Sequence, residues 1–167
     1  VNIMNKVKIG VVGAGIYGNY HIHTYACDPN VEKVVFCDLN DERKKAAEEK
    51  YGVKGYSTVK EMVEAEALDA VSVATSDPYH FDPCKDAIEA GVKYLLIEKP
   101  MALTVKECEE LIELAEKNNV KISVDFHKRW DPAYNCIKDD IKSEDKKIIR
   151  GYMALDDVIA VPDKWFT

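Results

Sequence analysis

Three glycines stand where an apolar run passes into a segment of helical spacing, in the stretch "VKIGVVGAGIYGNYH" at residues 7–21. The spacing G-x-G-x-x-G between a strand and a helix is typical of a dinucleotide-binding turn, although a glycine-rich turn without a ligand shares it. In the binding turn the first glycine permits a tight bend, the second lets a pyrophosphate touch the backbone, and the third lets the helix pack on the sheet. The helix N–H groups and dipole then face the anionic ligand. The residues expected to contact the dinucleotide here are Gly13, Gly15, Ile16, Tyr17 and Gly18.

An acidic residue closes the second apolar run, "VEKVVFCD". This residue, Asp38, lies twenty positions after Gly18. A carboxylate there can accept both ribose hydroxyls of NAD, and it would repel the 2′-phosphate of NADP. Arg43 lies close enough to Asp38 in the sequence to reduce the preference for NAD over NADP. We therefore expect NAD as the cofactor with NADP as a second candidate, while an aspartate in an ordinary strand-end turn is the alternative.

A lysine follows a fully apolar run in "LLIEKPMA", residues 95–102. Glu98, Lys99 and Pro100 thus stand at the carboxyl end of a predicted strand, which is where ligands bind in open α/β sheets. A lysine in that place can donate or accept a proton beside a bound nicotinamide. A lysine that only caps the turn is the alternative.

The elements that must position these residues alternate along the chain. Short β-branched runs predict strands at residues 6–12, 31–38, 68–75, 92–98 and 120–126, with a sixth at 53–56. Helical spacing predicts helices at residues 41–52, 58–67, 77–91 and 104–119, the last opened by a capping box of Thr104 and Glu107. Alternation of this kind is the pattern of βαβ units and predicts an α/β fold, a Rossmann-type doubly wound parallel sheet.

The six-strand unit closes near residue 126, so we expect a dinucleotide-binding domain over residues 1–126. Residues 127–167 differ in pattern. A polar helix is predicted at 130–145 and a strand at 146–161, and one helix and one strand cannot make a core of their own. We expect this tail to be the first helix and strand of an incomplete second α+β domain.

Composition excludes several classes of partner. The 167 residues carry a net charge of −7, which argues against nucleic acid and against anionic membrane surfaces. Apolar runs are far shorter than the ~20 residues that span a bilayer, and no basic-then-apolar signal segment opens the chain. Five cysteines form no CxxC pair, which favours reduced thiols in a cytoplasmic protein and no metal site. In the "HIH" of residues 21–23, the two histidines of a helix would lie ~200° apart and could not share an ion.

The segments GAGIYGNYH, VATSDPYHFDPCKDAIEAG and above all EKP, together with Asp38, resemble the Gfo/Idh/MocA family of oxidoreductases. This family is named for glucose–fructose oxidoreductase and inositol dehydrogenase. The resemblance extends along the chain to "DFHKRWDPAY" at residues 125–134, which is similar to the family's entry into its second domain. It implies hydride transfer between NAD(P) and a sugar, cyclitol or related polyol. In members of this family the site lies between a Rossmann domain and a mostly antiparallel sheet domain.

Residue by residue, the resemblance implies that Lys99 contacts substrate and helps proton transfer, and that Glu98 and Pro100 shape the nicotinamide pocket. It places His80 near the cofactor's ribose and nicotinamide, and Arg129 near the active site. It also implies that the loop containing Thr75 and Ser76 borders the cofactor.

Two further positions of the resemblance imply no catalytic role. His21 matches a histidine of structural rather than catalytic type. Asp77-Pro78 stands where many family members have Pro-Asn, so the sequence of that loop departs from the family's pattern.

The chain departs from the family in length. Family members are roughly twice as long and carry a catalytic aspartate and histidine, D-x-x-x-H, in the second domain, which residues 1–167 do not contain. We therefore expect this chain to be the cofactor-binding half of an oxidoreductase, inactive alone, whose whole protein is a homo-oligomer. The alternatives are a non-catalytic dinucleotide-binding module or sensor, and a Rossmann domain for another ligand such as a nucleotide-sugar or methyl donor.

Overall fold

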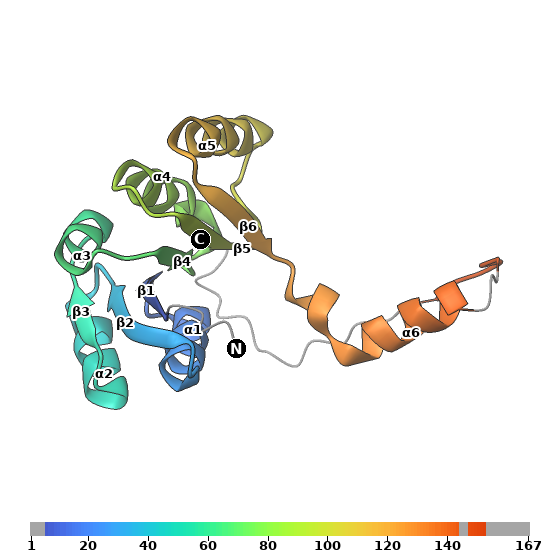
Figure 1. Ribbon diagram of the computed structural model, residues 1–167, viewed down its shortest axis with the longest axis horizontal. Coiled ribbons are helices and arrows are strands. Elements are labelled where there is room, and N and C mark those ends of the chain that lie inside the picture. Colours follow the sequence, from blue (N-terminus) through green and yellow to red (C-terminus); the bar gives the residue numbers. More distant parts are fainter. Residues whose placement is uncertain (1–5, 144–146, 153–167) are drawn as a thin grey trace. The chain divides into compact units, whose positions relative to one another are not determined.

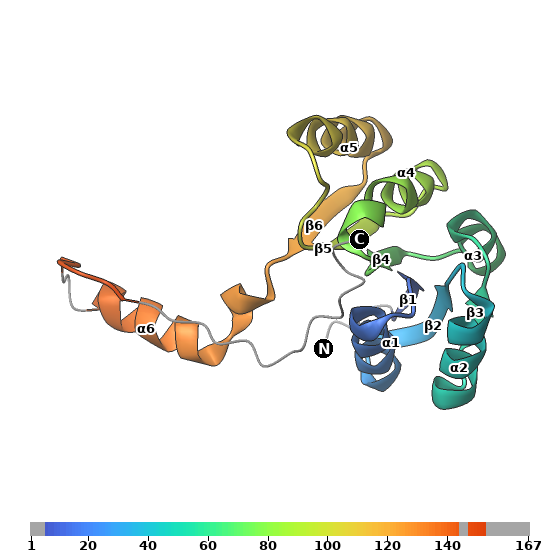
Figure 2. The same cartoon turned by 180° about the vertical axis from the view of Figure 1, so that it is seen from behind.

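The computed structural model describes residues 6–143 and 147–152, and Figures 1 and 2 show it from opposite sides. Six strands form one sheet in the order β3-β2-β1-β4-β5-β6, and every neighbouring pair is parallel. Each of the six strands predicted within residues 1–126 is present. The strands are β1 (Val7–Val12), β2 (Val31–Cys37), β3 (Lys54–Tyr56), β4 (Ala70–Val73), β5 (Tyr94–Glu98) and β6 (Lys121–Asp125). The fold is therefore the predicted α/β Rossmann-type sheet.

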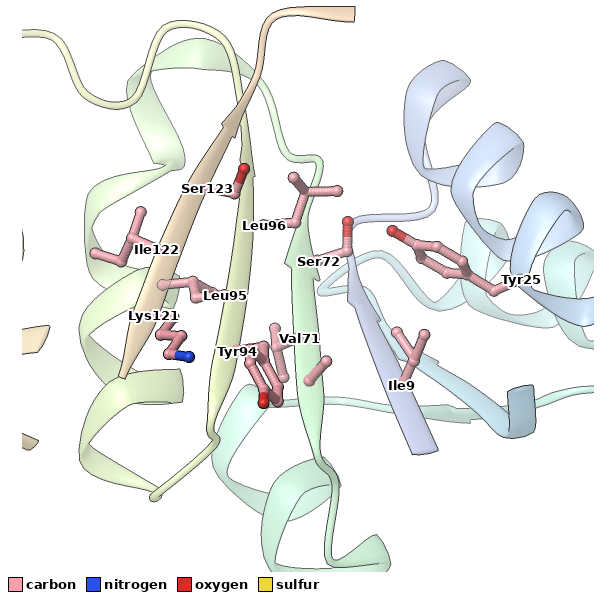
Figure 3. A pocket seen from close by; sticks show the side chains of 11 residues that line it. Ile9, Tyr25, Val71, Ser72, Tyr94, Leu95, Leu96, Lys121, Ile122 and Ser123 are labelled. Atoms are coloured by element: carbon pink, nitrogen blue, oxygen red, sulfur yellow. The ribbon is translucent and has the colours of Figure 1, made fainter. Parts of the chain in front are cut away.

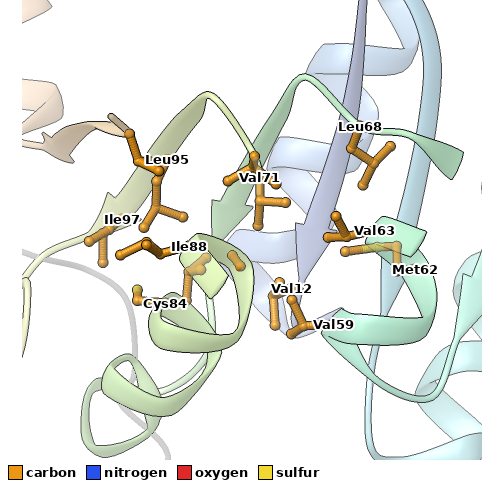
Figure 4. Packing of buried hydrophobic residues seen from close by; sticks show 14 of the residues in the cluster. Val12, Val59, Met62, Val63, Leu68, Val71, Cys84, Ile88, Leu95 and Ile97 are labelled. Atoms are coloured by element: carbon orange, nitrogen blue, oxygen red, sulfur yellow. The ribbon is translucent and has the colours of Figure 1, made fainter. Parts of the chain in front are cut away.

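Helices cover both faces of this sheet. The helices of the first unit are α1 (Ile16–Cys27), α2 (Asp41–Tyr51), α3 (Val59–Glu66), α4 (Phe81–Glu89) and α5 (Val105–Asn118). One buried cluster lies beneath α1 and α2 and includes Ile22 and Phe36. A larger cluster joins β4 and β5 to α3, α4 and α5 (Figure 4). Adjacent strand residues such as Val11 and Val12 belong to different clusters, because side chains of a strand alternate between its two faces.

The strand order reverses between β1 and β4. The chain runs from β1 outward to β3 and then returns to β4 on the other side of β1. In open α/β sheets of this topology the loops that follow the two central strands leave in opposite directions, and ligands bind in the crevice at the carboxyl ends of those strands, here β1 and β4. The glycine turn after β1 lies at this crevice.

Helix boundaries agree with the predictions except in one segment. The capping box is confirmed, since Thr104 Oγ1 accepts from Glu107 N–H and the Glu107 carboxylate accepts from Thr104 N–H. The single helix predicted at 77–91 is wrong. A 3₁₀ turn, η1 (Asp77–Tyr79), precedes α4, which starts at Phe81. Pro83 has no N–H for the carbonyl of Tyr79, and its ring would clash with that carbonyl, so one continuous helix cannot form.

The contacts between residues divide the chain into two compact units, and the second unit begins at Phe126. It contains a 3₁₀ turn, η2 (His127–Trp130), and the helix α6 (Pro132–Ser143), which confirms the helix predicted at 130–145. The strand predicted at 146–161 is wrong over residues 147–152, which have no regular structure. A strand needs a hydrogen-bonded neighbour, and no described strand pairs with this segment. The remainder of that predicted strand lies outside the described residues.

No helix in the described ranges is both long and apolar enough to cross a membrane. All five cysteines fall in these ranges and carry free thiols. Cys37 and Cys84 are buried, whereas Cys27 and Cys136 are exposed. Burial, followed by the negative charge of Asp38, raises the pKa of the Cys37 thiol to about 12. Burial raises the pKa of Cys84 to about 12 as well.

These pKa values predict a graded thiol reactivity. The thiolate is the reactive form, so a disulfide reagent at about pH 8 should modify Cys27 and Cys136 quickly and leave Cys37 and Cys84 intact until the protein is unfolded. Mass spectrometry of labelled peptides gives the rate at each site. All five thiols should react in denaturant without reductant. Fast native labelling of Cys37 would contradict its burial in the larger of the two clusters.

Candidate functional site

The turn between β1 and α1 contains two glycines at which a side chain would be strained or would clash. Gly13 has a φ of +91°, a conformation that side chains disfavour, and a Cβ there would lie 3.0 Å from the carbonyl oxygen of Ala74. A Cβ at Gly18 would overlap the carbonyl oxygen of Gly13. The helix α1 therefore packs directly on the turn, and the turn packs on the residue that follows β4.

The middle glycine differs, because a Cβ on Gly15 would meet no atom within 4 Å. Gly15 is the N-cap of α1, and no described side chain caps it. The Asn19 side-chain amide holds the turn by donating to the carbonyls of Ala14 (2.7 Å) and Gly15 (2.8 Å). An open, uncapped helix N-terminus with room above its glycine fits a pyrophosphate, which the helix N–H groups and dipole attract.

Asp38 connects the end of β2 to this turn. The Asp38 carboxylate accepts from the N–H of Ala14 at 2.8 Å and from the N–H of Asn40 at 2.7 Å. The guanidinium of Arg43 also donates to it, with Nη2 3.1 Å from Oδ1. Asp38 is buried, whereas the side chain of Arg43 is 57% exposed. The carboxylate is thus fixed in place, and Arg43 is the partner that can move aside for a ribose.

The end of β5 brings Lys99 toward the same helix. Its Nζ lies 5.9 Å from the centre of the Tyr17 ring, within the range of a cation–π contact. The preceding residue, Glu98, is buried and accepts from His21 Nε2 at 3.0 Å and from the backbone N–H of Lys99. The Lys99–Pro100 peptide bond is cis. Lys99 therefore lies at the carboxyl edge of the sheet beside the first turn of α1.

The hydrogen bonds of Glu98 decide its charge. Burial opposes ionisation most strongly, but the hydrogen bonds from His21 and the Lys99 N–H, together with the Lys99 ammonium, outweigh it. They hold the pKa of Glu98 below its ordinary value. Glu98 is consequently a carboxylate near neutral pH and can only accept hydrogen bonds.

The loop after β4 is joined to the loop after β5 by His80. This side chain is buried, and its two ring nitrogens lie 2.6 Å from the Pro100 carbonyl oxygen and 3.0 Å from that of Thr75. The Thr75 hydroxyl donates to the Tyr79 carbonyl, while Ser76 is exposed and its hydroxyl makes no cap on η1. His80 thus borders the crevice through the two loops that it connects, and Ser76 is the more accessible hydroxyl.

Arg129 and the two histidines of "HIH" are the remaining candidates, and the predicted place of Arg129 near the active site stays a prediction. Arg129 belongs to the second unit, where its guanidinium lies 5.8 Å from the centre of the Phe126 ring. The histidines of "HIH" meet different neighbours. His21 contacts Ser72 and Glu98, whereas His23 is exposed beside Cys27 and Tyr51.

A family model described as an oxidoreductase family with an NAD-binding Rossmann fold matches residues 7–126. The chain belongs to the Gfo/Idh/MocA family of oxidoreductases. The match includes the glycine turn, Asp38 and the segment Glu98–Pro100. The sequence resemblance is thereby confirmed, although the roles of the individual site residues stay predictions.

Named relatives agree with this membership. The inositol 2-dehydrogenase of Salmonella typhimurium is 32% identical over 141 residues, 82% of this chain and 42% of that protein. The D-apiose dehydrogenase of Paraburkholderia graminis is 30% identical over 135 residues, 80% of this chain and 36% of that protein. A solved scyllo-inositol dehydrogenase from Lactobacillus casei, with bound NAD(H) and scyllo-inositol, matches the fold with a TM-score of 0.76 at 23% identity, over 84% of this chain and 42% of that one. The chain spans less than half the length of these relatives.

Sequence reasoning missed three residues of this Gfo/Idh/MocA chain's site: Asn19, Ser72 and Asp125. Asn19 fixes the glycine turn, and its position directly after the last glycine was an available signal. Ser72 lies in β4 and is 1% exposed, and the signal was a polar residue inside an apolar strand. Asp125 ends β6 as Glu98 ends β5.

His21, Glu98 and Asp125 bring three ligand-type atoms within 4.8 Å of one another. The 3.0 Å contact between His21 Nε2 and Glu98 is that of a hydrogen bond. Among the described side chains, no buried nitrogen or oxygen atom is without a partner. Within this cluster His21 and Glu98 are therefore hydrogen-bonded to each other.

A cavity of about 190 Å³ lies apart from the glycine turn, on the sheet face beside α1 (Figure 3). It is lined by side chains of β1, β4, β5 and β6 and by Tyr25, and its lining is mostly apolar. Its lining includes no residue of the glycine turn or of the N-terminus of α1, so this cavity is not the predicted dinucleotide site. The open crevice at the carboxyl edge remains the candidate.

Two alanine substitutions distinguish a glycine required for folding from a glycine required for cofactor binding. Gly18→Ala should lower the free energy of unfolding by about 3 kcal/mol, because its Cβ overlaps backbone. Gly15→Ala should change that free energy by no more than about 1 kcal/mol, yet weaken NADH binding at least about tenfold, because its methyl group fills the space above the helix N-terminus. Thermal denaturation and NADH fluorescence titration give the two quantities. Unchanged NADH affinity in Gly15→Ala would contradict the placement of the pyrophosphate.

Proposed function

We propose that the protein carrying this chain is an NAD-dependent oxidoreductase that transfers a hydride between nicotinamide and a CH–OH carbon of a sugar, cyclitol or related polyol. This chain is its cofactor-binding half. The observation that carries the proposal is that the open glycine turn, the buried Asp38 carboxylate and Lys99 all lie at the carboxyl edge of one parallel sheet. The names of the relatives support the substrate class, since those proteins are inositol and apiose dehydrogenases.

Each residue group has one task in this function. The N–H groups at the start of α1 bind the pyrophosphate, and the Asp38 carboxylate accepts the adenosine ribose hydroxyls once Arg43 turns outward. Bound NAD supplies the hydride acceptor. Lys99 holds or moves the hydroxyl proton that must leave when the carbinol carbon is oxidised.

Hydride transfer requires the reacting atoms to be held ~3–3.5 Å apart. Lys99 provides one proton-handling group, but a polyol also needs a wall that fixes its ring and a base that takes its proton. We propose that these groups lie outside residues 1–167. The chain then binds NAD without turning substrate over.

The relative affinities for NAD and NADP test the role proposed for Asp38. The unmodified chain should bind NAD at least about tenfold more tightly than NADP, because the fixed carboxylate repels a 2′-phosphate. Asp38→Asn should narrow that gap, because the amide oxygen can still accept from the backbone but the charge is gone. Arg43→Ala, the matched change of the partner, should widen it by removing the nearby cation. Isothermal titration calorimetry measures all three, and equal affinities in the unmodified chain would refute the role of Asp38.

Turnover measurements test the proposal that residues 1–167 bind NAD but lack part of the catalytic groups. Residues 1–167 should show no NAD reduction with myo-inositol or glucose, whereas the whole protein should turn over a polyol. In the whole protein Lys99→Met should lower kcat by about 10²–10⁴-fold and change the NAD dissociation constant by less than about threefold. Steady-state absorbance of NADH is the readout. Turnover by residues 1–167 would contradict the proposal, and NAD binding without turnover in the whole protein would favour a non-catalytic module.

A further inference from the structure

Helix α1 meets the end of β5 through two side chains one turn apart. Tyr17 and His21 are four residues apart, so they lie on the same face of the helix. The Tyr17 ring lies beneath the Lys99 ammonium, and the His21 ring reaches the Glu98 carboxylate. One helix face therefore contacts both Lys99 and the residue before it.

The His21 ring is held in a defined orientation. Because Glu98 can only accept, the His21 nitrogen that faces it, Nε2, carries a proton. The other nitrogen, Nδ1, lies 2.6 Å from the Ser72 hydroxyl of β4. The Tyr25 ring packs edge-on against the imidazole, with ring centres 5.9 Å apart. Strand β4 and the next turn of α1 thus fix the direction in which His21 donates.

The same carboxylate fixes the backbone of Lys99. Glu98 accepts from the Lys99 N–H as well as from His21, and the Glu98 and His21 side chains are only 7% and 11% exposed. A buried carboxylate without its donor would turn toward water, because an unpaired charge in the interior is costly. Loss of His21 would therefore release both Glu98 and the Lys99 N–H.

We propose that His21 and Tyr17 are positioning residues that hold Lys99 at the catalytic edge, His21 through Glu98 and Tyr17 through its ring. The inference deepens the proposed function, since the task of Lys99 in proton transfer rests on it. It also assigns two tasks to the same helix, α1. The helix whose N-terminus receives the pyrophosphate is the body that fixes the lysine, so the distance between cofactor and lysine is set within one rigid element.

The test follows Lys99 by NMR in isotopically labelled residues 1–167, with resonances assigned through Lys99→Arg. His21→Leu should raise the exchange rate of the Lys99 amide at least about tenfold. His21→Gln, whose side-chain N–H can still reach Glu98, should restore slow exchange. His23→Leu is the matched control on the exposed side of the same helix and should leave the Lys99 amide unchanged.

Tyr17→Leu tests the other contact and remains informative if His21→Leu does not fold. It should remove the upfield ring-current shift of the Lys99 ε-methylene protons and leave exchange of the Lys99 amide slow. Slow exchange in a folded His21→Leu, or unshifted ε-methylene signals in the unmodified chain, would overturn the proposal. General loosening by His21→Leu would raise exchange across α1 and β5 and would not be restored by His21→Gln, which would overturn it too.

Titration with NADH separates this inference from the proposed function. The Lys99 signals are read without cofactor, so they test the two contacts even if NADH does not bind. Failure of the unmodified chain to bind NADH would contradict the proposed function alone. In the whole protein, His21→Leu should lower kcat and His21→Gln should recover it, with the NAD dissociation constant within about threefold of the unmodified value.

Discussion

The site depends on one close approach, that of α1 to the turn from which it starts. Gly18 packs on the carbonyl of Gly13 with no space for a side chain, and Gly13 in turn packs on Ala74 after β4. This contact sets the direction of α1. It leaves the helix N-terminus uncapped at the crevice between β1 and β4 and turns Tyr17 and His21 toward the end of β5. If the helix stood one side-chain radius further away, these contacts would be lost together.

Electrostatics follow from this geometry. Two buried carboxylates, Asp38 and Glu98, stand at the ends of β2 and β5, and burial alone would neutralise or expel them. Backbone N–H groups offset that cost at both positions, from Ala14 and Asn40 at the first and from Lys99 at the second. The charges are therefore held in fixed orientations before any ligand arrives. Prealigned groups of this kind do not have to reorganise when a cofactor binds.

The sequence predicted what depends on local pattern and missed what depends on distant contacts. The strand runs up to residue 126, the capping box at Thr104 and the packing of Gly13 and Gly18 are local, and they were predicted correctly. The helix expected at 77–91 failed because Pro83 denies a hydrogen bond to Tyr79, a signal that was present but outweighed by helical spacing. The pairing of His21 with Glu98 joins residues 77 positions apart, and no periodicity encodes it.

The central claim is that one helix places both the pyrophosphate and the lysine. A crystal structure of residues 1–167 grown with NADH tests it most directly. The account predicts the pyrophosphate against the N–H groups after Gly15, the adenosine ribose on Asp38 with Arg43 turned outward, and the nicotinamide on the side of α1 that faces Lys99. A dinucleotide bound elsewhere, or one at the turn whose nicotinamide points away from Lys99, would contradict the account.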